Sequence, residues 1–169
     1  MVQGLFIPAD EMIAPGLRSV EGRDDFEEVL DGWAEATDLP ELNATLYVHG
    51  NGHALDLPFN RRATYLWWFH EPEAIGRARL VGDAVLLGAV NADGTCTGLP
   101  VAIWDRILSR ATYNVARKET TDVRWHPSPL DHDDYFEAVV WATLLLEHAP
   151  GLEVRIDQVG PAPFNNPPT

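Results

Sequence analysis

The stretch of residues 43–88 constrains the fold most strongly, because it combines strand patterns, turn residues and a dense cluster of aromatic side chains. Residues 44–49 (ATLYVH) are rich in residue types that favour strands. The Asn-Gly pair that follows tolerates positive φ and predicts a tight hairpin turn, with residues 53–57 as the return strand. Pro58 cannot donate to a ladder, so that strand should end there.

A short helix is predicted next, at residues 61–69. Asn60 can accept hydrogen bonds from the free N–H groups of a first helical turn, so we expect it to be the N-cap. Arg61 and Arg62 occupy that turn, where the positive end of the helix dipole disfavours cations. A sequence that breaks a local rule in this way often does so at a functional site. Both arginines are therefore candidates for docking a partner, and the alternative is that they pair with the chain's own carboxylates.

The other elements follow from hydrophobic periodicity and from the positions of proline and glycine. Together they predict an α+β fold, in which a mainly antiparallel sheet of about five to seven strands is covered by two long and two short helices. The expected strands lie at residues 2–7, 80–90, 120–125 and 152–159. The expected helices lie at residues 24–30, 100–118 and 132–147. A hairpin turn is expected at residues 91–94, and loops are expected at residues 9–22 and from residue 126.

The helix predicted at residues 100–118 presents a basic row on its outward side. Arg106, Arg110 and Arg117 recur there at helical spacing, with Tyr113 between them. Basic side chains with an interleaved aromatic ring suit a phosphate backbone or an acidic partner. The alternative is a solvated face whose arginines pair with acids of the same chain.

The helix predicted at residues 132–147 is apolar nearly all round, because Trp141 and Leu144 interrupt its polar arc. A helix of this kind is buried on several sides or meets a partner. We therefore expect Trp141 and Leu144 to be the positions where the protein could form a homodimer.

The net charge of −14 is unevenly spread along the chain. Residues 1–60 hold 12 acids and 2 arginines, for a charge of −10, and residues 119–169 hold 9 acids and 2 arginines, for a charge of −7. The middle, residues 61–118, carries +3. Such a chain repels phosphates, so direct binding of nucleic acid is not expected as its main task. Imitation of a nucleic acid by the acidic surface is an alternative.

The expected location is the cytoplasm. No apolar run approaches the roughly 20 residues of a membrane span, and the first residues lack the basic region and cleavage site of a signal peptide. Cys96 is the single cysteine, so neither an intrachain disulfide nor a cysteine zinc cluster is expected.

Catalytic motifs are missing from the sequence: there is no Walker loop, no dinucleotide glycine fingerprint, no nucleophile elbow and no His-Glu-x-x-His. No cofactor is expected. Three histidines are weak candidates for a zinc site if they converge, namely His49 and His53 beside the predicted turn and His70 at the end of the aromatic helix. A metal-dependent enzyme or binder is therefore an alternative function.

The run YVHGNGHALDLPFNRRATYL at residues 47–66, followed by LVGDAVLLG at residues 80–88, resembles an uncharacterised family of small proteins from bacteriophages and actinobacterial mobile elements. The resemblance covers roughly residues 1–100, and the sequence departs from the family pattern at His49, Gly50 and His53. It implies a phage-like setting and a domain type, and no activity. The matching positions are Tyr47, Val48, Gly52, Leu57, Pro58, Asn60, Arg61, Arg62, Ala63, Thr64, Gly82 and Asp83.

These observations predict one α+β domain over residues 1–160, with a family-like part at 1–100, an extension at 101–160 packed on it, and a disordered tail at 161–169. The expected function is binding of a host macromolecule, a protein, without catalysis. The positions expected to bind that partner or an anion are Arg61, Arg62, Trp67, Trp68, Arg106, Arg110 and Arg117.

Overall fold

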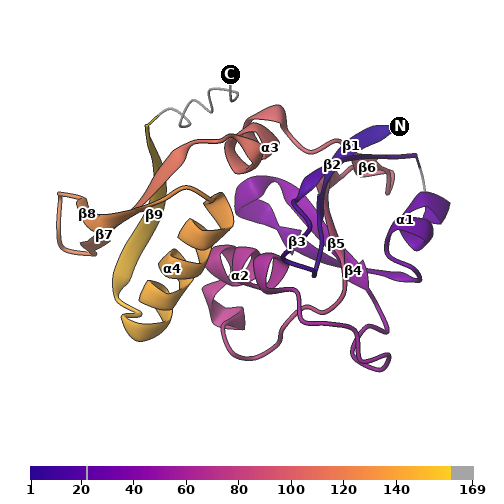
Figure 1. The fold of residues 1–169 in the computed structure, drawn as a ribbon, viewed down its shortest axis with the longest axis horizontal. Helices are drawn as coiled ribbons and strands as arrows, with labels where there is room; N and C mark the ends of the chain where they lie inside the picture. The colour runs from indigo at the N-terminus through magenta and orange to yellow at the C-terminus, as the bar shows by residue number, and fades with distance from the viewer. Residues whose placement is uncertain (22, 161–169) are drawn as a thin grey trace, which may run out of the picture.

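The structure is a computed structural model that describes residues 1–21 and 23–160, and within that range the side chains of residues 23 and 24 are not described. The tail predicted at residues 161–169 lies outside the described residues. The described part is α+β, as the sequence predicts, with two antiparallel sheets and four α-helices (Figure 1).

The larger sheet has six strands, all paired antiparallel, in the order β2-β1-β5-β4-β3, with β6 also paired to β5. Tyr47 pairs with Val85, so the first strand predicted in the central stretch and the later Gly-Asp strand are neighbours in one sheet. The strands are β1 (Val2–Ile7), β2 (Gly16–Val20), β3 (Ala34–Leu39), β4 (Ala44–His49), β5 (Ala84–Val90) and β6 (Cys96–Thr97).

The smaller sheet is formed by β7 (Thr112–Glu119), β8 (His126–His132) and β9 (Leu152–Gly160), in the order β8-β7-β9. Its central strand β7 pairs with β9 over its full length. The sequence predicts one sheet, and the second sheet is a feature that it does not reveal.

The helices are α1 (Arg23–Val29), α2 (Arg61–His70), α3 (Val101–Leu108) and α4 (Tyr135–His148), with short 3₁₀ turns at Pro40–Leu42 and Pro72–Ala74. In Figure 1, α4 lies against the smaller sheet and α2 lies between α4 and the larger sheet, whereas α1 lies on the opposite side. No helix in the described part of the chain is both long and apolar enough to cross a membrane.

The two faces of the larger sheet differ in how they are covered. The inner face, which carries Leu46 and Leu86, belongs to a core cluster of 22 buried residues that includes side chains of α2, α4 and the smaller sheet. The outer face, which carries Tyr47, Val85 and Leu87, belongs to a cluster of 6 buried residues that includes Phe26 of α1. Alternate residues of β4 and β5 therefore point to a large core and to a small one.

The return strand predicted at residues 53–57 is wrong. This segment forms consecutive turns, in which Leu55 N donates to Asn51 O at 3.0 Å and Leu57 N donates to Gly52 O at 3.0 Å. The physical reason is that β3 and β5 already occupy both edges of β4, so no side of its ladder is left for a hairpin partner.

The long helix predicted at residues 100–118 is also wrong in its second half. The helix ends at Leu108, and the segment from Thr112 is strand β7. Its aromatic and β-branched residues favour a strand once β9 offers a full-length partner.

The predictions for three other segments are wrong. Residues 120–125, predicted as a strand, are a connection that opens with a turn in which Asp122 N donates to Glu119 O at 2.9 Å. The segment that follows is strand β8, although its prolines predict a loop. Pro127 and Pro129 are tolerated because β8 is an edge strand. The strand β2 lies within the loop predicted at residues 9–22, and its partner is β1.

Candidate functional site

Asn60 joins three parts of the fold at the start of α2. Its side chain is fully buried, and its Oδ1 accepts from Ala63 N at 3.0 Å, which confirms the predicted N-cap. Its Nδ2 donates to the carbonyls of Ile7 and Gly82, each at 2.9 Å. One amide side chain therefore holds the end of β1, the approach to β5 and the first turn of α2 in register.

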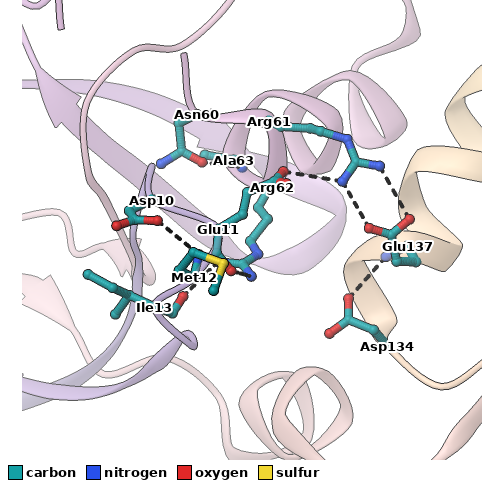
Figure 2. Close-up of polar contacts among 10 residues, drawn as sticks. All are labelled: Asp10, Glu11, Met12, Ile13, Asn60, Arg61, Arg62, Ala63, Asp134 and Glu137. Atoms are coloured by element: carbon teal, nitrogen blue, oxygen red, sulfur yellow. Dashed lines mark hydrogen bonds and ion pairs between the residues drawn. The ribbon is translucent and has the colours of Figure 1, made fainter. Parts of the chain in front are cut away.

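Arg61 joins α2 to α4. Its guanidinium binds both carboxylate oxygens of Glu137, at 2.9 and 3.2 Å, and Glu11 at 3.2 Å (Figure 2). The hydrogen bond from Arg61 lowers the pKa of the Glu137 carboxyl, and the same bond raises the pKa of Arg61. The alternative stated for this arginine, pairing with the chain's own carboxylates, is confirmed.

Arg62 holds the segment that follows β1. Its two terminal nitrogens donate to the carbonyls of Ile13 at 2.8 Å and Glu11 at 2.9 Å, as Figure 2 shows. Both guanidinium groups are thus engaged within the chain. A role for them in docking a partner stays a prediction, and the geometry favours a structural role.

The basic row predicted on residues 100–118 does not exist as a row. Arg106 lies on α3, Arg110 lies in the connection after it, and Arg117 lies on strand β7. Arg106 donates to the carbonyl of Ile156, and Tyr113, placed between the arginines in the prediction, is fully buried. The three arginines therefore cannot act as one helical surface.

The three histidines suggested as zinc ligands do not meet. Nδ1 of His49 accepts from Asn51 N at 3.0 Å, and Nε2 of His53 lies 2.9 Å from the carbonyl of Arg79. Nδ1 of His70 lies 3.2 Å from the Glu41 carboxylate. Among the described residues, no group of three His, Cys, Asp or Glu side chains is arranged to hold a metal ion.

The predicted aromatic positions of α2 are packed against the protein. Trp67 packs against the inner core, and Trp68 donates its indole N–H to the carbonyl of Ala78 at 2.9 Å. On α4, Leu144 is partly buried and Trp141 remains 40% exposed. Half of the 14 residues of α4 are buried, in line with one of the two alternatives for this helix, and self-association through Trp141 and Leu144 stays a prediction.

The outer face of the larger sheet contains a cavity of about 470 Å³ that the sequence does not reveal. Three aromatic side chains line it, and they come from α1, from the residue before β3 and from β4. Its other lining residues are mainly small or apolar, with one carboxylate and one thiol. The lining is formed by Val2, Val20, Glu21, Phe26, Trp33, Ala34, Tyr47, Gly94, Thr95 and Cys96.

Tyr47 forms the floor of this outer cavity. Its ring lies 4.7 Å from that of Phe26 between centroids, at an angle of 40°. Its hydroxyl shares a hydrogen bond of 3.4 Å with Cys96 Sγ. Burial raises the pKa of Tyr47, and the contact with Cys96 raises it further, so the phenol stays neutral at physiological pH.

Trp33 forms a wall of the outer cavity and is 52% exposed. Its carbonyl accepts from Gly50 N at 2.7 Å, which extends the pairing of β3 with β4 by one step. Its ring lies directly on the backbone of Gly50, where an added Cβ would come within 2.1 Å of the indole. Glycine at residue 50 is therefore what allows the indole to approach the backbone at the end of β4 so closely.

The electrostatics of the outer cavity favour a cation. Glu21 contributes a carboxylate to the lining, and no lysine or arginine is among the described residues that form it. Seven of the ten lining residues come from residues 1–60, a stretch of the sequence with a charge of −10. Aromatic faces and a carboxylate around one apolar space are the arrangement that recognises positively charged groups.

Comparison with known proteins identifies the family of this chain. A family model described as a domain of unknown function, DUF3846, matches residues 4–112. The chain belongs to the DUF3846 family. No curated protein and no solved structure matches it.

The DUF3846 match extends from β1 to the first residue of β7. It includes Asn60, Arg61 and Arg62, and it includes all residues that line the outer cavity except Val2. Glu137, the main partner of Arg61, lies beyond the match. The DUF3846 part of the chain therefore contains the cavity nearly complete, whereas the α2–α4 ion pair also requires the region that follows.

Proposed function

We propose that this protein is a non-enzymatic binding protein that takes up a positively charged side chain of a partner protein in the outer cavity. The observation that carries the proposal is the lining of that cavity by Phe26, Trp33, Tyr47 and Glu21. The proposal includes the setting implied by the resemblance, which is a phage-type protein in the cytoplasm of a bacterial host, with a host protein as the partner.

The attraction between a cation and the face of an aromatic ring amounts to about 0.5–1 kcal/mol at exposed sites and about 2 kcal/mol when water is excluded. Trp33 offers a partly exposed face, and the rings of Phe26 and Tyr47 lie deeper. A lysine or arginine side chain that enters past Trp33 would therefore gain most of its binding free energy once its charged end reaches the rings of Phe26 and Tyr47. Glu21 would add a charged hydrogen-bond partner.

The size and charge of the protein support a macromolecular partner with a basic surface. A volume of about 470 Å³ lies within the range of specific binding pockets and exceeds what one side chain needs. The net charge of −14 attracts a basic partner over a longer range and raises the rate of encounter. Binding should accordingly weaken as salt concentration rises.

The alternatives are supported less well by the geometry. Docking through Arg61 and Arg62 would require both guanidinium groups to leave contacts that they make within the chain. A metal site at His49, His53 and His70 would require three separate side chains to converge. Imitation of a nucleic acid stays a prediction, since it requires carboxylates in rows spaced like phosphates.

The proposal can be tested with two small molecules of the same shape and different charge. Choline and its uncharged analogue 3,3-dimethyl-1-butanol are titrated into the full chain, and the indole N–H of Trp33 is followed by NMR. We expect choline to bind about tenfold more tightly, because only the cation interacts with the ring faces. Equal binding of the two molecules would contradict the proposal.

Variants of the chain locate the site. Trp33→Ala should abolish the choline response, and Glu21→Gln should weaken it severalfold. Trp141→Ala is the matched control, because Trp141 is similarly exposed but lies on α4, which contributes nothing to the outer cavity. N-acetyl-arginine amide and N-acetyl-lysine amide then test whether the outer cavity accepts a protein side chain. If neither binds while choline does, the ligand is a free small cation and the proposed partner protein is ruled out.

A further inference from the structure

Strand β3 forms one outer edge of the larger sheet. It is the last strand in the order β2-β1-β5-β4-β3, and β4 is the strand paired with it. Just before β3, the carbonyl of Trp33 accepts from Gly50 N across the same ladder. Since the backbone groups of an antiparallel strand point to alternate sides, those of Ala34, Ala36 and Asp38 face away from β4. No other described segment is paired with them.

The free edge of β3 lacks the backbone features that usually protect an exposed edge from a further strand. Such edges are commonly blocked by a proline, a lysine or a bulge. Strand β8, an edge of the smaller sheet, has Pro127, Pro129 and an irregular register with β7. In contrast, β3 contains neither proline nor lysine, pairs with β4 without a register shift, and has Ala36 exposed near its centre. The backbone of β3 can therefore accept an added strand.

The charged residues of β3 restrict which strand can be added. Glu35 and Asp38 are its charged side chains, and both are exposed. A second copy of this chain would bring carboxylates against carboxylates, and the net charge of −14 would add to that repulsion. The same groups attract a basic segment, so the charge of this edge favours a basic partner over self-association.

A groove of about 420 Å³ lies beside β3, between this strand and the turn that follows α2. Its lining includes one tryptophan, three acids and one arginine. No ion pair within the described part of the chain engages Glu71 or Glu73. This edge groove therefore combines an aromatic residue with an excess of carboxylates, as the outer cavity does. The lining is formed by Thr37, Asp38, Trp67, Glu71, Glu73, Ala74 and Arg77.

The outer cavity and the edge groove adjoin β3 at positions three residues apart. Ala34 lines the outer cavity, and Thr37 lines the edge groove. Ala36 lies opposite Tyr47 in the ladder, so the side chains of Ala36 and Ala34 belong to the outer face of the sheet. Leu39 belongs to the inner core, so Thr37 belongs to the inner face. A strand added beside β3 would therefore direct the side chain opposite Ala34 to the outer cavity and the one opposite Thr37 to the edge groove.

We infer that the partner protein contributes an extended, basic segment that adds to the free edge of β3 as a further strand of the larger sheet. This inference rests on the proposed function and specifies how the partner is held. Backbone hydrogen bonds to Ala34, Ala36 and Asp38 hold the segment, as in other cases of strand addition. One cationic side chain enters the outer cavity, and a second, three positions along the segment, lies in the edge groove near Glu71 and Glu73.

Two hexapeptides of identical composition test this inference on the full chain. Acetyl-Thr-Lys-Thr-Val-Lys-Thr-amide has its lysines three positions apart, on opposite faces of a strand. Acetyl-Thr-Lys-Thr-Lys-Val-Thr-amide has them two positions apart, on the same face. A third peptide repeats the first sequence with N-methylated amides, which cannot donate to β3. NMR follows the indole N–H of Trp33 and the hydrogen exchange of the Ala36 amide, which faces the free edge.

The first peptide should bind about tenfold more tightly than either of the others and should slow the exchange of the Ala36 amide. It alone combines backbone donors with lysines that reach both the outer cavity and the edge groove. Equal binding of all three peptides, with unchanged exchange at Ala36, would overturn the inference. So would the absence of any peptide binding.

A choline titration of the same sample separates this inference from the proposed function. If choline binds and the peptides neither differ nor protect the Ala36 amide, strand addition is wrong and the outer cavity remains a cation site. If choline does not bind, the proposed function fails, and the inference that rests on it fails as well.

Variants test the edge and the edge groove separately. Ala36→Pro removes an N–H that faces away from β4, so the first peptide should bind about tenfold more weakly while thermal unfolding shows a folded chain. Val123→Pro is the matched control, because this residue is 93% exposed in the connection between β7 and β8, and it should leave peptide binding unchanged.

Glu71→Gln/Glu73→Gln should remove the preference for lysines three positions apart, because the second lysine then lacks its carboxylates. Protection of the Ala36 amide by the first peptide should remain, a combination that a purely structural role of the two acids would not produce. A preference for this spacing that persists in the double variant would contradict the role given to the edge groove.

Discussion

The inner and outer faces of the larger sheet are built from alternate residues of the same strands, yet they are organised for different purposes. The inner face belongs to a core of 22 buried residues that spans both sheets and three helices. The outer face belongs to a core of 6 buried residues, with α1 as its one helix and a cavity of about 470 Å³ beside it. The comparison teaches that this chain concentrates its packing on one face and leaves a cavity on the other.

The polar groups follow the same division. On the inner side, Asn60 and Arg61 are used to join elements that are distant in sequence. On the outer side, Glu21 lies at the surface of the cavity, and Tyr47 has Cys96 as its side-chain hydrogen-bond partner. Stability should therefore respond more strongly to an inner substitution than to the matched outer one, while ligand binding at the outer cavity should show the opposite pattern.

The largest expected effect comes from two adjacent leucines of β5 that point to opposite faces. Leu86 and Leu87 are both fully buried, the first in the inner core and the second in the outer core. Leu86→Ala should lower the free energy of unfolding by about 4 kcal/mol, because the surrounding core cannot collapse around the lost atoms. Leu87→Ala should cost about 2.5 kcal/mol, because the smaller core can relax. Urea unfolding measures both losses. A larger loss for Leu87→Ala than for Leu86→Ala would contradict the difference in packing between the two faces.

The next effect concerns the amide that joins β1, α2 and the approach to β5. Asn60→Ala removes three hydrogen bonds and leaves the carbonyls of Ile7 and Gly82 without that donor. The expected loss is about 3 kcal/mol in the free energy of unfolding. Asn51→Ala, in an exposed turn, is the matched control and should change stability by no more than about 0.5 kcal/mol. Similar values for the two variants would remove the structural role assigned to Asn60.

A smaller effect is expected for the ion pair between Arg61 and Glu137, whose side chains are 32% and 52% exposed. A double-mutant cycle with Arg61→Gln and Glu137→Gln should give a coupling of about 0.5–1 kcal/mol, because water screens the charges. Arg61 lowers the pKa of Glu137 in the folded state, so the contribution is complete above the ordinary value of 4.5 and is lost as pH falls through the lowered pKa.

The pH dependence gives this cycle an independent check. The unfolded chain binds a proton at Glu137 more readily than the folded chain, so acidification between those two pKa values should favour unfolding. Glu137→Gln should reduce the slope of stability against pH in that range. An unchanged slope would show that the carboxyl titrates alike in both states and that the pair contributes little.

Local chemistry made part of the fold predictable. Strand β4 follows from its β-branched and aromatic residues, and the start of α2 follows from Asn60, whose side chain caps the helix that it begins. In both cases the deciding interactions lie within a few residues in sequence. The hairpin turn at residues 91–94 is correct for the same reason, since Asn91 N donates to Thr95 O at 2.9 Å.

The errors come from pairing over long distances in sequence. The residues of β7 fit a helical spacing, and β9, some forty residues later, makes them a strand. Both edges of β4 are occupied by strands whose positions the local sequence does not specify, which excludes the predicted hairpin. A periodic pattern states which residues are buried and leaves the partner undetermined.

The candidate site was unpredictable for the same reason. Phe26, Trp33 and Tyr47 meet because α1 covers β4 and because β3 and β4 pair in one register, with Ala36 opposite Tyr47. The unusual position of the arginines is visible in the sequence, but the partner of Arg61 is 76 residues away. The broken rule in the first turn of α2 therefore marks a structural contact, whereas the outer cavity is lined by residues that break no local rule.

The smallest expected effect is the one that separates packing from binding most directly. Trp33→Ala should change the free energy of unfolding by no more than about 0.5 kcal/mol, because the indole is 52% exposed and lies on the outer face. Trp67→Ala, the matched control on the inner side, should cost about 2 kcal/mol, because that indole packs against the inner core. Thermal and urea unfolding measure both. Equal losses would mean that Trp33 supports the fold as much as Trp67 does. Trp33 would then have a structural role beyond its contacts with Gly50 and the outer cavity.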